Sequence, residues 1–225
     1  MTPADALARF GSQGYSFRMS FWPTKDHWSV EIPVRTNHYI CPAVESEGFV
    51  ALAPFDQPIS AQEWEGLEYL NWKSGGDTNF APLASADGQL DCRGFWDKGK
   101  TDKDALWTSN AALAPTLQRY VDSIGANFGR VRIIKLEPQD REQALKSFHR
   151  DDNNRFNPEN EGWVLRTWIE LTDNPDSYML LMDLDDEHLP IAETERRVPL
   201  SAGSRFVVDT QRLWHVVVHN GTAPR

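Results

Sequence analysis

Three residues in the C-terminal part of the sequence have the side-chain types and spacing to bind one metal ion: His149, Asp151 and His215. His149 and Asp151 are two positions apart, so on an extended strand both side chains point to the same face. A second histidine from a facing strand would complete a set of two imidazoles and one carboxylate. Such a set leaves coordination positions open on iron(II) for a substrate and dioxygen. These residues therefore predict a mononuclear non-haem iron(II) centre.

Other residues in the sequence support the interpretation of the His-x-Asp pattern as part of a metal site. With six His in the chain, about half a match is expected by chance, so the pattern alone has low specificity. His215, however, lies in an apolar segment with strand character, Leu213–His219, and Arg225 follows it ten residues later. A guanidinium near a metal can bind a carboxylate through two parallel hydrogen bonds. Arg225 is therefore a candidate clamp for a dicarboxylate.

In this order and spacing, these residues resemble the iron(II)/2-oxoglutarate-dependent oxygenases. The segment Gly203–Arg225 is especially similar to the aspartyl/asparaginyl β-hydroxylase-like, cupin-like branch, where the second metal histidine is followed by Val, Asn and then the co-substrate arginine. The segment Leu165–Trp168 is similar to a strand of that branch whose arginine, here Arg166, also contacts 2-oxoglutarate. The resemblance covers residues 131–225, and nothing comparable is recognised in residues 1–130.

The resemblance implies a double-stranded β-helix fold that holds iron(II) and uses 2-oxoglutarate and dioxygen. The keto acid of 2-oxoglutarate would bind the iron, and its far carboxylate would bind Arg225. Arg166 and Trp168 would be further co-substrate contacts. A paired charge inside the barrel is the alternative for Arg166, and core packing is the alternative for Trp168. Succinate and carbon dioxide would be the products of the co-substrate.

The expected reaction is hydroxylation of an unactivated C–H bond, since related halogenases have a small residue where Asp151 stands. A free amino acid or similar small metabolite is the expected substrate. Two alternatives stay open: the same chemistry on a peptide, protein or carrier-tethered residue, and a cupin-type metal-binding protein without oxygenase activity. The candidate substrate contacts are Asp152, Asn153 and Arg155 in the loop that leaves the metal strand, together with Trp214 and His38.

The role of Arg225 depends on how the chain turns after the metal strand. A strict two-residue hairpin at Asn220-Gly221 would pair Arg225 with Val216, on the face opposite to His215. For Arg225 to serve the metal site, the loop must be longer or bulged, or the chain must cross to the other sheet.

The elements that would position these residues are mainly strands. Alternating or continuous apolar runs rich in Val, Ile, Trp and Tyr favour strands. The predicted strands cover residues 131–136, 164–171, 178–182, 205–208 and 213–219, and further short strands are expected between Tyr15 and Ala53.

The N-terminal half is predicted to add helices and a loop. Short helices are expected at Pro3–Phe10 and, after a capping box at Ser60–Glu63, at Trp64–Trp72. A longer helix is expected at Leu106–Ile124. Residues 73–104 are rich in Gly, Asp and Lys, and they are predicted to form a long irregular loop between the second and third of these helices. This loop is a possible lid. The expected fold is mainly β with flanking helices, a jelly-roll or cupin-like barrel in one domain (1–225), with 1–130 as support and 131–225 carrying the metal.

Composition excludes several classes of function. The net charge is −10, and without a concentrated basic patch the chain is not expected to bind nucleic acid. The acidic balance is explained by solubility alone, and the alternative is a small cationic or zwitterionic partner. Two distant cysteines and no apolar N-terminal run predict a cytoplasmic protein without a membrane partner. The sequence also lacks the GxGxxG, Walker, GxSxG and HExxH motifs.

Overall fold

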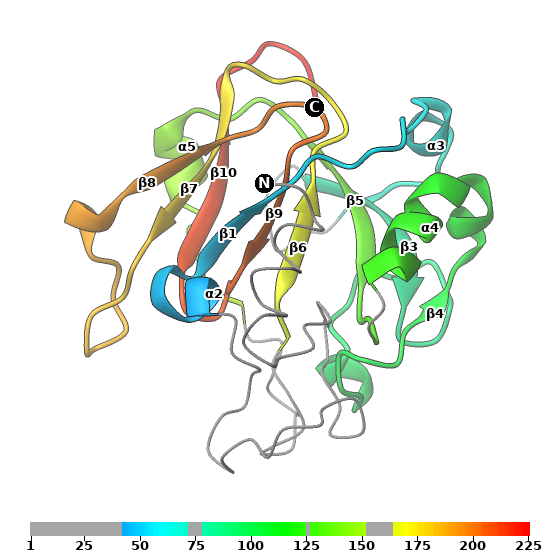
Figure 1. The fold of residues 1–225 in the computed structure, drawn as a ribbon, viewed down its shortest axis with the longest axis horizontal. Coiled ribbons are helices and arrows are strands. Elements are labelled where there is room, and N and C mark those ends of the chain that lie inside the picture. The colour runs from blue at the N-terminus through cyan, green and yellow to red at the C-terminus, as the bar shows by residue number, and fades with distance from the viewer. Residues whose placement is uncertain (1–41, 72–77, 125–126, 152–163) are drawn as a thin grey trace, which may run out of the picture.

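The structure contains two three-stranded antiparallel sheets, the second of which carries His215 (Figure 1). The structure, a computed structural model, describes residues 42–71, 78–124, 127–151 and 164–225. The helix predicted at Pro3–Phe10 and the strands predicted before residue 42 lie outside these ranges. The first sheet consists of β1 (Phe49–Leu52), β9 (Arg205–Val208) and β6 (Arg166–Ile169), and the second of β10 (Trp214–His219), β7 (Ser177–Met182) and β8 (Arg196–Pro199), in these orders.

The inner faces of the two sheets share one hydrophobic core. Residues two apart on a strand point to the same face. From the first sheet, Trp168, Phe206 and Val208 enter a buried cluster, and Met179 and Leu181 enter the same cluster from the second sheet. The sheets therefore pack face to face, as expected for antiparallel sheets that bury one side.

A short helix, α5 (Arg141–Leu145), covers the outer face of the second sheet. Its Ala144 lies in a separate buried cluster with Leu180 and Val216, which point outward from β7 and β10. The side chain of Asp140 caps the helix, because it accepts a hydrogen bond of 2.8 Å from the backbone N–H of Gln143. This helix leads directly to the segment that contains His149.

A third sheet lies beside the first (Figure 1). It consists of β2 (Leu70–Asn71), β3 (Thr78–Ser85) and β4 (Leu106–Trp107), with β5 (Val131–Leu136) paired antiparallel to β3. One face packs on α4 (Pro115–Ile124) and on the 3-10 turn η3 (Ser109–Leu113). The remaining described helices are α2 (Pro42–Glu47), α3 (Gln62–Glu65), η2 (Trp96–Lys98) and η4 (Ala192–Thr194).

The strands predicted after residue 130 are confirmed as β5, β6, β7, β9 and β10, although β6 is shorter than predicted. The prediction of an irregular loop over 73–104 is wrong for residues 78–85. These residues form β3, whose last six residues are buried. Flanking Gly and Asp residues obscured this strand, whose apolar side chains pack against α4 and η3.

The two helix predictions in the N-terminal half need correction. The helix predicted at Trp64–Trp72 is wrong beyond Glu65, because the chain turns into β2. The capping box does not form, since Glu63 instead accepts hydrogen bonds from the backbone N–H groups of Thr116 and Leu117 at 2.9 and 3.2 Å. This carboxylate therefore caps α4, which lies far away in the sequence.

The helix predicted at Leu106–Ile124 is divided into β4, η3 and α4. Pro115 explains where α4 begins: its ring fixes φ and it has no N–H to donate to a preceding turn, so it starts a helix rather than continuing one. The described residues confirm a mainly β fold with flanking helices, and their sheets do not close into a barrel. None of the described helices is long and apolar enough to cross a bilayer.

Candidate metal centre

The backbone brings His149 and Asp151 to the strand that carries His215. His149 and His215 form an antiparallel bridge, in which the N–H of His215 donates to the carbonyl of His149 at 2.9 Å and the reverse bond is 3.3 Å. The N–H of Asp151 donates to the carbonyl of Thr210 at 2.9 Å. One potential ligand atom from each of the three predicted residues lies within 4.8 Å of the others, so the three can hold one ion.

Hydrogen bonds fix the two histidine rings for binding through Nε2. Nδ1 of His149 lies 2.7 Å from the carbonyl oxygen of Ser147, and Nδ1 of His215 lies 3.3 Å from the carbonyl oxygen of Leu213. A carbonyl only accepts, so Nδ1 is the donor in each ring, and in a neutral imidazole this leaves the lone pair on Nε2. His149 is exposed, whereas His215 is buried.

Burial also sets the protonation of His215. Desolvation lowers the pKa of His215 to about 4, even though the nearby carboxylate of Asp151 acts in the opposite direction. The ring is therefore neutral near pH 7. A neutral imidazole is the form that binds a metal without first losing a proton.

The carboxylate of Asp151 is oriented by two donors on one of its oxygens. Oδ2 accepts a hydrogen bond of 2.7 Å from the hydroxyl of Thr210, and lies 3.2 Å from Nε of Arg166. The other oxygen, Oδ1, lies 3.9 Å from Nε2 of His149. Partners that hold a ligating carboxylate in this way are typical of metal sites. Arg166 thus pairs with the candidate metal ligand, which is the paired-charge alternative for this residue.

The chain crosses to the third sheet before Arg225. Its N–H and carbonyl both pair with the backbone of Leu136, the last residue of β5, at 3.0 Å. A two-residue hairpin is therefore not formed. The side chain ends at Glu170, whose Oε2 pairs with Nη2 of Arg225. Of the alternatives that geometry left open, the crossing is the one observed.

Two buried donors lie along the same inner side of β6. Arg166, Trp168 and Glu170 follow each other at two-residue steps, so they share one face. Nη1 of Arg225, beside Glu170, and Nε1 of Trp168 are buried and have no hydrogen-bond acceptor among the described residues. Buried donors are normally paired, so these two are candidates for binding an acceptor on a ligand.

His219 holds the turn that leads to Arg225, a role that the sequence did not reveal. Its Nδ1 and Nε2 lie 2.7 Å from the hydroxyl of Ser177 and the carbonyl of Ala223. Gly221 is required here, since a Cβ at this position would lie 2.4 Å from the His219 ring. The ring therefore supports the turn rather than the metal.

Among the other predicted contacts, the structure describes Trp214. Trp214 precedes His215 and points to the outer face of the second sheet, where it packs near Phe148 and its Nε1 donates to the carbonyl of His188 at 3.1 Å. Its role as a substrate contact stays a prediction. Asp152, Asn153, Arg155 and His38 lie outside the described residues.

Comparison with known proteins adds no relative to this picture. No protein-family model matches the chain, and searches of the curated proteins and of the solved structures give no match either. The function must therefore be argued from the residues and their geometry.

Proposed function

We propose that this protein is an iron(II)- and 2-oxoglutarate-dependent oxygenase that hydroxylates a C–H bond of a small metabolite. The main support for this proposal is that His149, Asp151 and His215 lie together. One potential ligand atom from each residue lies within 4.8 Å of the other two. Two nitrogen donors and one carboxylate oxygen suit iron(II) and leave other coordination positions open.

Bound iron(II) would supply the activation of dioxygen that couples loss of carbon dioxide from 2-oxoglutarate to substrate hydroxylation. The protein's own contribution is orientation. The carbonyls of Ser147 and Leu213 hold the two imidazoles, and Thr210 and Arg166 hold Asp151. A ligand set fixed before the metal arrives loses less conformational freedom on binding.

The unsatisfied donors on the inner side of β6 support 2-oxoglutarate as co-substrate. Strands rise about 3.3 Å per residue, so Trp168 lies about 7 Å along β6 from Arg166, and Glu170 about 13 Å. A dicarboxylate with one end on the metal would extend along this face. The free edge of the Arg225 guanidinium and the Trp168 indole are donors for its far carboxylate.

The buried Glu170 must tolerate this second carboxylate. Burial raises the pKa of Glu170, while the charge of Arg225 acts to lower it. The direction of the shift favours uptake of a proton by Glu170 when another anion approaches. Arg225 could then exchange an internal partner for the co-substrate.

We also propose that the two facing sheets are the two halves of a double-stranded β-helix. The first sheet would carry Arg166 and Trp168 and the second His215, so that the site lies between them at the end of the shared core. This arrangement is that of the oxygenases that the sequence resembles, the aspartyl/asparaginyl β-hydroxylase-like branch.

The ion pair between Arg225 and Glu170 favours a second candidate, a cupin-type metal protein that does not use 2-oxoglutarate. In that case the guanidinium already has its physiological partner. The two candidates differ in one measurable property, which is whether 2-oxoglutarate binds to the metal.

An anaerobic optical titration tests the proposal. The iron(II)-loaded protein should develop a weak visible charge-transfer band when 2-oxoglutarate is added, and the Asp151→Ala variant should not. Succinate release in air, stimulated by a member of an amino-acid panel, should follow. Metal binding without a band would reject the oxygenase and favour the cupin-type candidate.

A further inference from the structure

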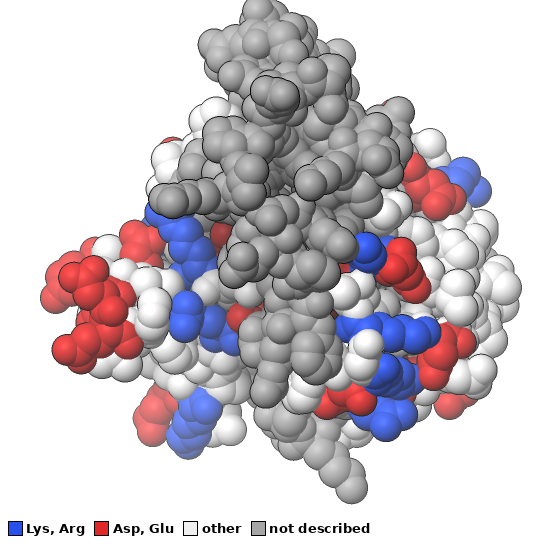
Figure 2. Space-filling model, turned by 90° about the horizontal axis from the view of Figure 1, so that it is seen from below, with Lys and Arg blue, Asp and Glu red and all other residues white. Residues whose placement is uncertain are grey.

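Three guanidinium groups gather beside the carboxylate of Asp151. Arg166 comes from β6, Arg132 from β5, and Arg130 from the residues just before β5. Arg132 is close enough to Arg130, Arg166 and Asp151 for the charges of all three to act on it. Charge of both signs is spread over the surface in Figure 2, with a group of acidic side chains where β7 joins β8. A local excess of positive charge at the metal site is thus compatible with the acidic chain.

Two carboxylates match two of these three arginines. Asp151 lies 3.2 Å from Arg166. The buried Asp102 accepts a hydrogen bond of 2.9 Å from the backbone N–H of Arg130, and its other oxygen lies 4.0 Å from Nε of the same residue. Within the described part of the chain, these two carboxylates leave Arg132 as the guanidinium of the three with no acidic group paired to it.

Arg132 is the arginine left without an acidic partner. Among residues 42–71, 78–124, 127–151 and 164–225, its guanidinium forms no hydrogen bond or ion pair. Its contact is with an aromatic ring, since the guanidinium carbon lies 4.1 Å from the centroid of Phe80. Such stacking fixes the plane of the group and leaves its N–H edge available to an acceptor.

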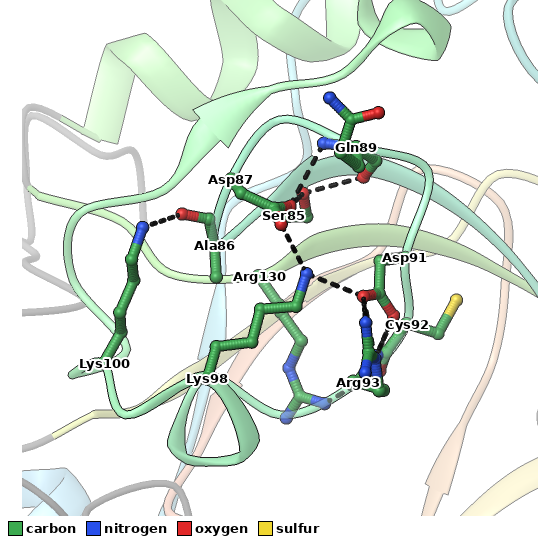
Figure 3. Close-up of polar contacts among 10 residues, drawn as sticks. All are labelled: Ser85, Ala86, Asp87, Gln89, Asp91, Cys92, Arg93, Lys98, Lys100 and Arg130. Carbon is green, nitrogen blue, oxygen red and sulfur yellow. Dashed lines mark hydrogen bonds and ion pairs between the residues drawn. The ribbon is translucent and has the colours of Figure 1, made fainter.

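Nearby acidic groups are bound elsewhere. In the loop after β3, Lys98 contacts both Asp87 and Asp91 at 2.7 Å, and Arg93 pairs with Asp91 at 2.8 Å (Figure 3). Arg130 reaches the same loop through the carbonyl of Cys92, at 3.4 Å. These contacts hold the loop in place, and they give its acids partners other than Arg132.

The place of Asp102 is equally restricted. A Cβ at Gly129 would lie 1.8 Å from Oδ1 of Asp102, so only glycine allows this carboxylate to lie against the backbone before Arg130. Asp102 is therefore committed to Arg130 by the local geometry. The charge imbalance at Arg132 is built into the packing.

The electrostatics of Arg132 agree with this geometry. Desolvation lowers the pKa of Arg132 to about 9, the charges of Arg130 and Arg166 act in the same direction, and Asp151 acts against them. A bound anion would oppose all of the unfavourable contributions.

We propose that Arg132 binds an anionic group of the substrate, and that the substrate is therefore a carboxylic acid held by this guanidinium beside the metal centre. This inference rests on the proposed function. Of the two kinds of partner that the net charge suggested, cationic and zwitterionic, it retains the zwitterion, such as a free amino acid.

Arg132 and Arg225 serve different carboxylates. The backbone partner of Arg225 is Leu136, four residues from Arg132 on β5. At about 3.3 Å per residue these positions are about 13 Å apart. The two guanidinium groups are also held by different partners, Glu170 for Arg225 and the Phe80 ring for Arg132, so we assign Arg225 to the co-substrate and Arg132 to the substrate.

Chemical modification of arginine tests this assignment without requiring turnover. The zinc-loaded protein, with 2-oxoglutarate present, is treated with phenylglyoxal, and the modification of individual arginines is followed by peptide mass spectrometry. Acetate should slow modification of Arg132 about threefold or more, because a charge-assisted bidentate pair shields the reacting nitrogens. Acetamide, which has the same shape but no charge, should give no protection.

Arg197 is the matched control. It is an exposed arginine on β8 that stacks on Tyr178 at 4.8 Å, and its modification should be indifferent to both probes. The proposal is overturned if acetate and acetamide protect Arg132 equally, or if neither of them protects it. A zinc-loaded sample without 2-oxoglutarate is compared as well: if adding 2-oxoglutarate by itself protects Arg132, the proposal is overturned, because Arg132 would then serve the co-substrate.

Steady-state kinetics give a second, independent reading. An amino acid that stimulates succinate release should do so at least about tenfold better, in kcat/KM, than its primary amide. Arg132→Gln should bring this ratio close to one, Arg132→Lys should restore part of it, and the KM for 2-oxoglutarate should stay the same. A raised KM for 2-oxoglutarate with an unchanged acid-to-amide ratio contradicts the assignment.

The failure of this inference is distinguishable from that of the proposed function. The charge-transfer band reports whether iron and 2-oxoglutarate bind, and it does not involve Arg132. A protein that shows the band but has no acid-specific protection of Arg132 retains the proposed function and loses the substrate assignment.

Discussion

The two ends of the inner face of β6 differ in how their polar groups are satisfied. At the Asp151 end, each group that would not contact the metal has a partner within the protein: Thr210 and Arg166 for the carboxylate, and main-chain carbonyls for the two imidazoles. At the Arg225 end, buried donors of Arg225 and Trp168 have no acceptor among the described residues. The three candidate metal ligands are thus held by partners within the protein, whereas the donors at the Arg225 end have none among the described residues.

This difference indicates two modes of recognition within one site. The metal end is preorganised, so binding there should depend on a few residues and tolerate little change. The Arg225 end holds its cation through Glu170, a partner that a ligand would have to share. Each end should therefore respond to a different set of substitutions.

The largest effect is expected at the metal end. Asp151→Ala removes a ligand and leaves the guanidinium of Arg166 without this carboxylate, so iron(II) affinity should fall more than about 100-fold, beyond the loss seen for outer-shell partners. Metal content after dialysis and a competition titration would measure it. Asp186→Ala, on an exposed turn, is the control. Normal iron retention by Asp151→Ala would reject the ligand assignment.

The next largest effect is expected at the Arg225 end, on the binding of 2-oxoglutarate. Arg225→Gln removes the charge that would bind the far carboxylate, and hydrogen bonds to charged groups contribute about 1.5–3 kcal/mol. The Kd for 2-oxoglutarate should therefore rise about 10- to 100-fold while iron(II) affinity is kept. The charge-transfer titration gives both quantities. An unchanged Kd would mean that Glu170, and not 2-oxoglutarate, is the partner of Arg225. That result would favour the cupin-type candidate.

A smaller effect should come from the orientation of the metal carboxylate. Thr210→Val keeps the shape of the side chain and removes the donor to Oδ2 of Asp151. Outer-shell partners contribute about 10-fold to metal affinity at the low end of their range, so a loss of this size is expected. Thr210→Ser should recover it. A loss in both variants would show that packing, and not the hydroxyl, matters at this position.

The smallest effect concerns the turn that places Arg225. Ser177→Ala removes the hydrogen bond to His219, and the free energy of unfolding should decrease by about 1–2 kcal/mol. The Kd for 2-oxoglutarate should rise only a few-fold, with iron(II) affinity unchanged, because the turn is loosened and not removed. Denaturant unfolding and the optical titration would measure these. Ser46→Ala, at an exposed serine, should change neither; an iron-binding defect in Ser177→Ala would contradict the separation of the two ends.

The sequence was informative where local pattern and function coincide. The alternating or continuous apolar residues of β5, β7, β9 and β10 predicted these strands, and the spacing of His149, Asp151 and His215 predicted residues that the fold brings together. These features depend on neighbours within a few positions. A reading of the chain one segment at a time can find them.

Features that depend on distant pairings were missed. Glu63 caps α4 because the fold brings it to Thr116, and nothing near Glu63 indicates that partner. The three-arginine cluster likewise forms only when β5 and β6 approach the loop that contains Asp102. Arg130 and Arg132 are two positions apart in the sequence, but the sequence does not show that the described residues give Arg132 an aromatic contact and no acidic partner.

The bridge between His149 and His215 has a consequence for the whole chain. A metal that binds both side chains would cross-link two points that enclose about 65 residues, and closing a loop of this size removes several kcal/mol of chain entropy from the unfolded state. Because the ion binds the folded form, its loss should lower the thermal midpoint of the entire sandwich as well as stop the chemistry. The ion would then act as a reversible cross-link, so that the availability of metal in the cell would set the lifetime of the protein.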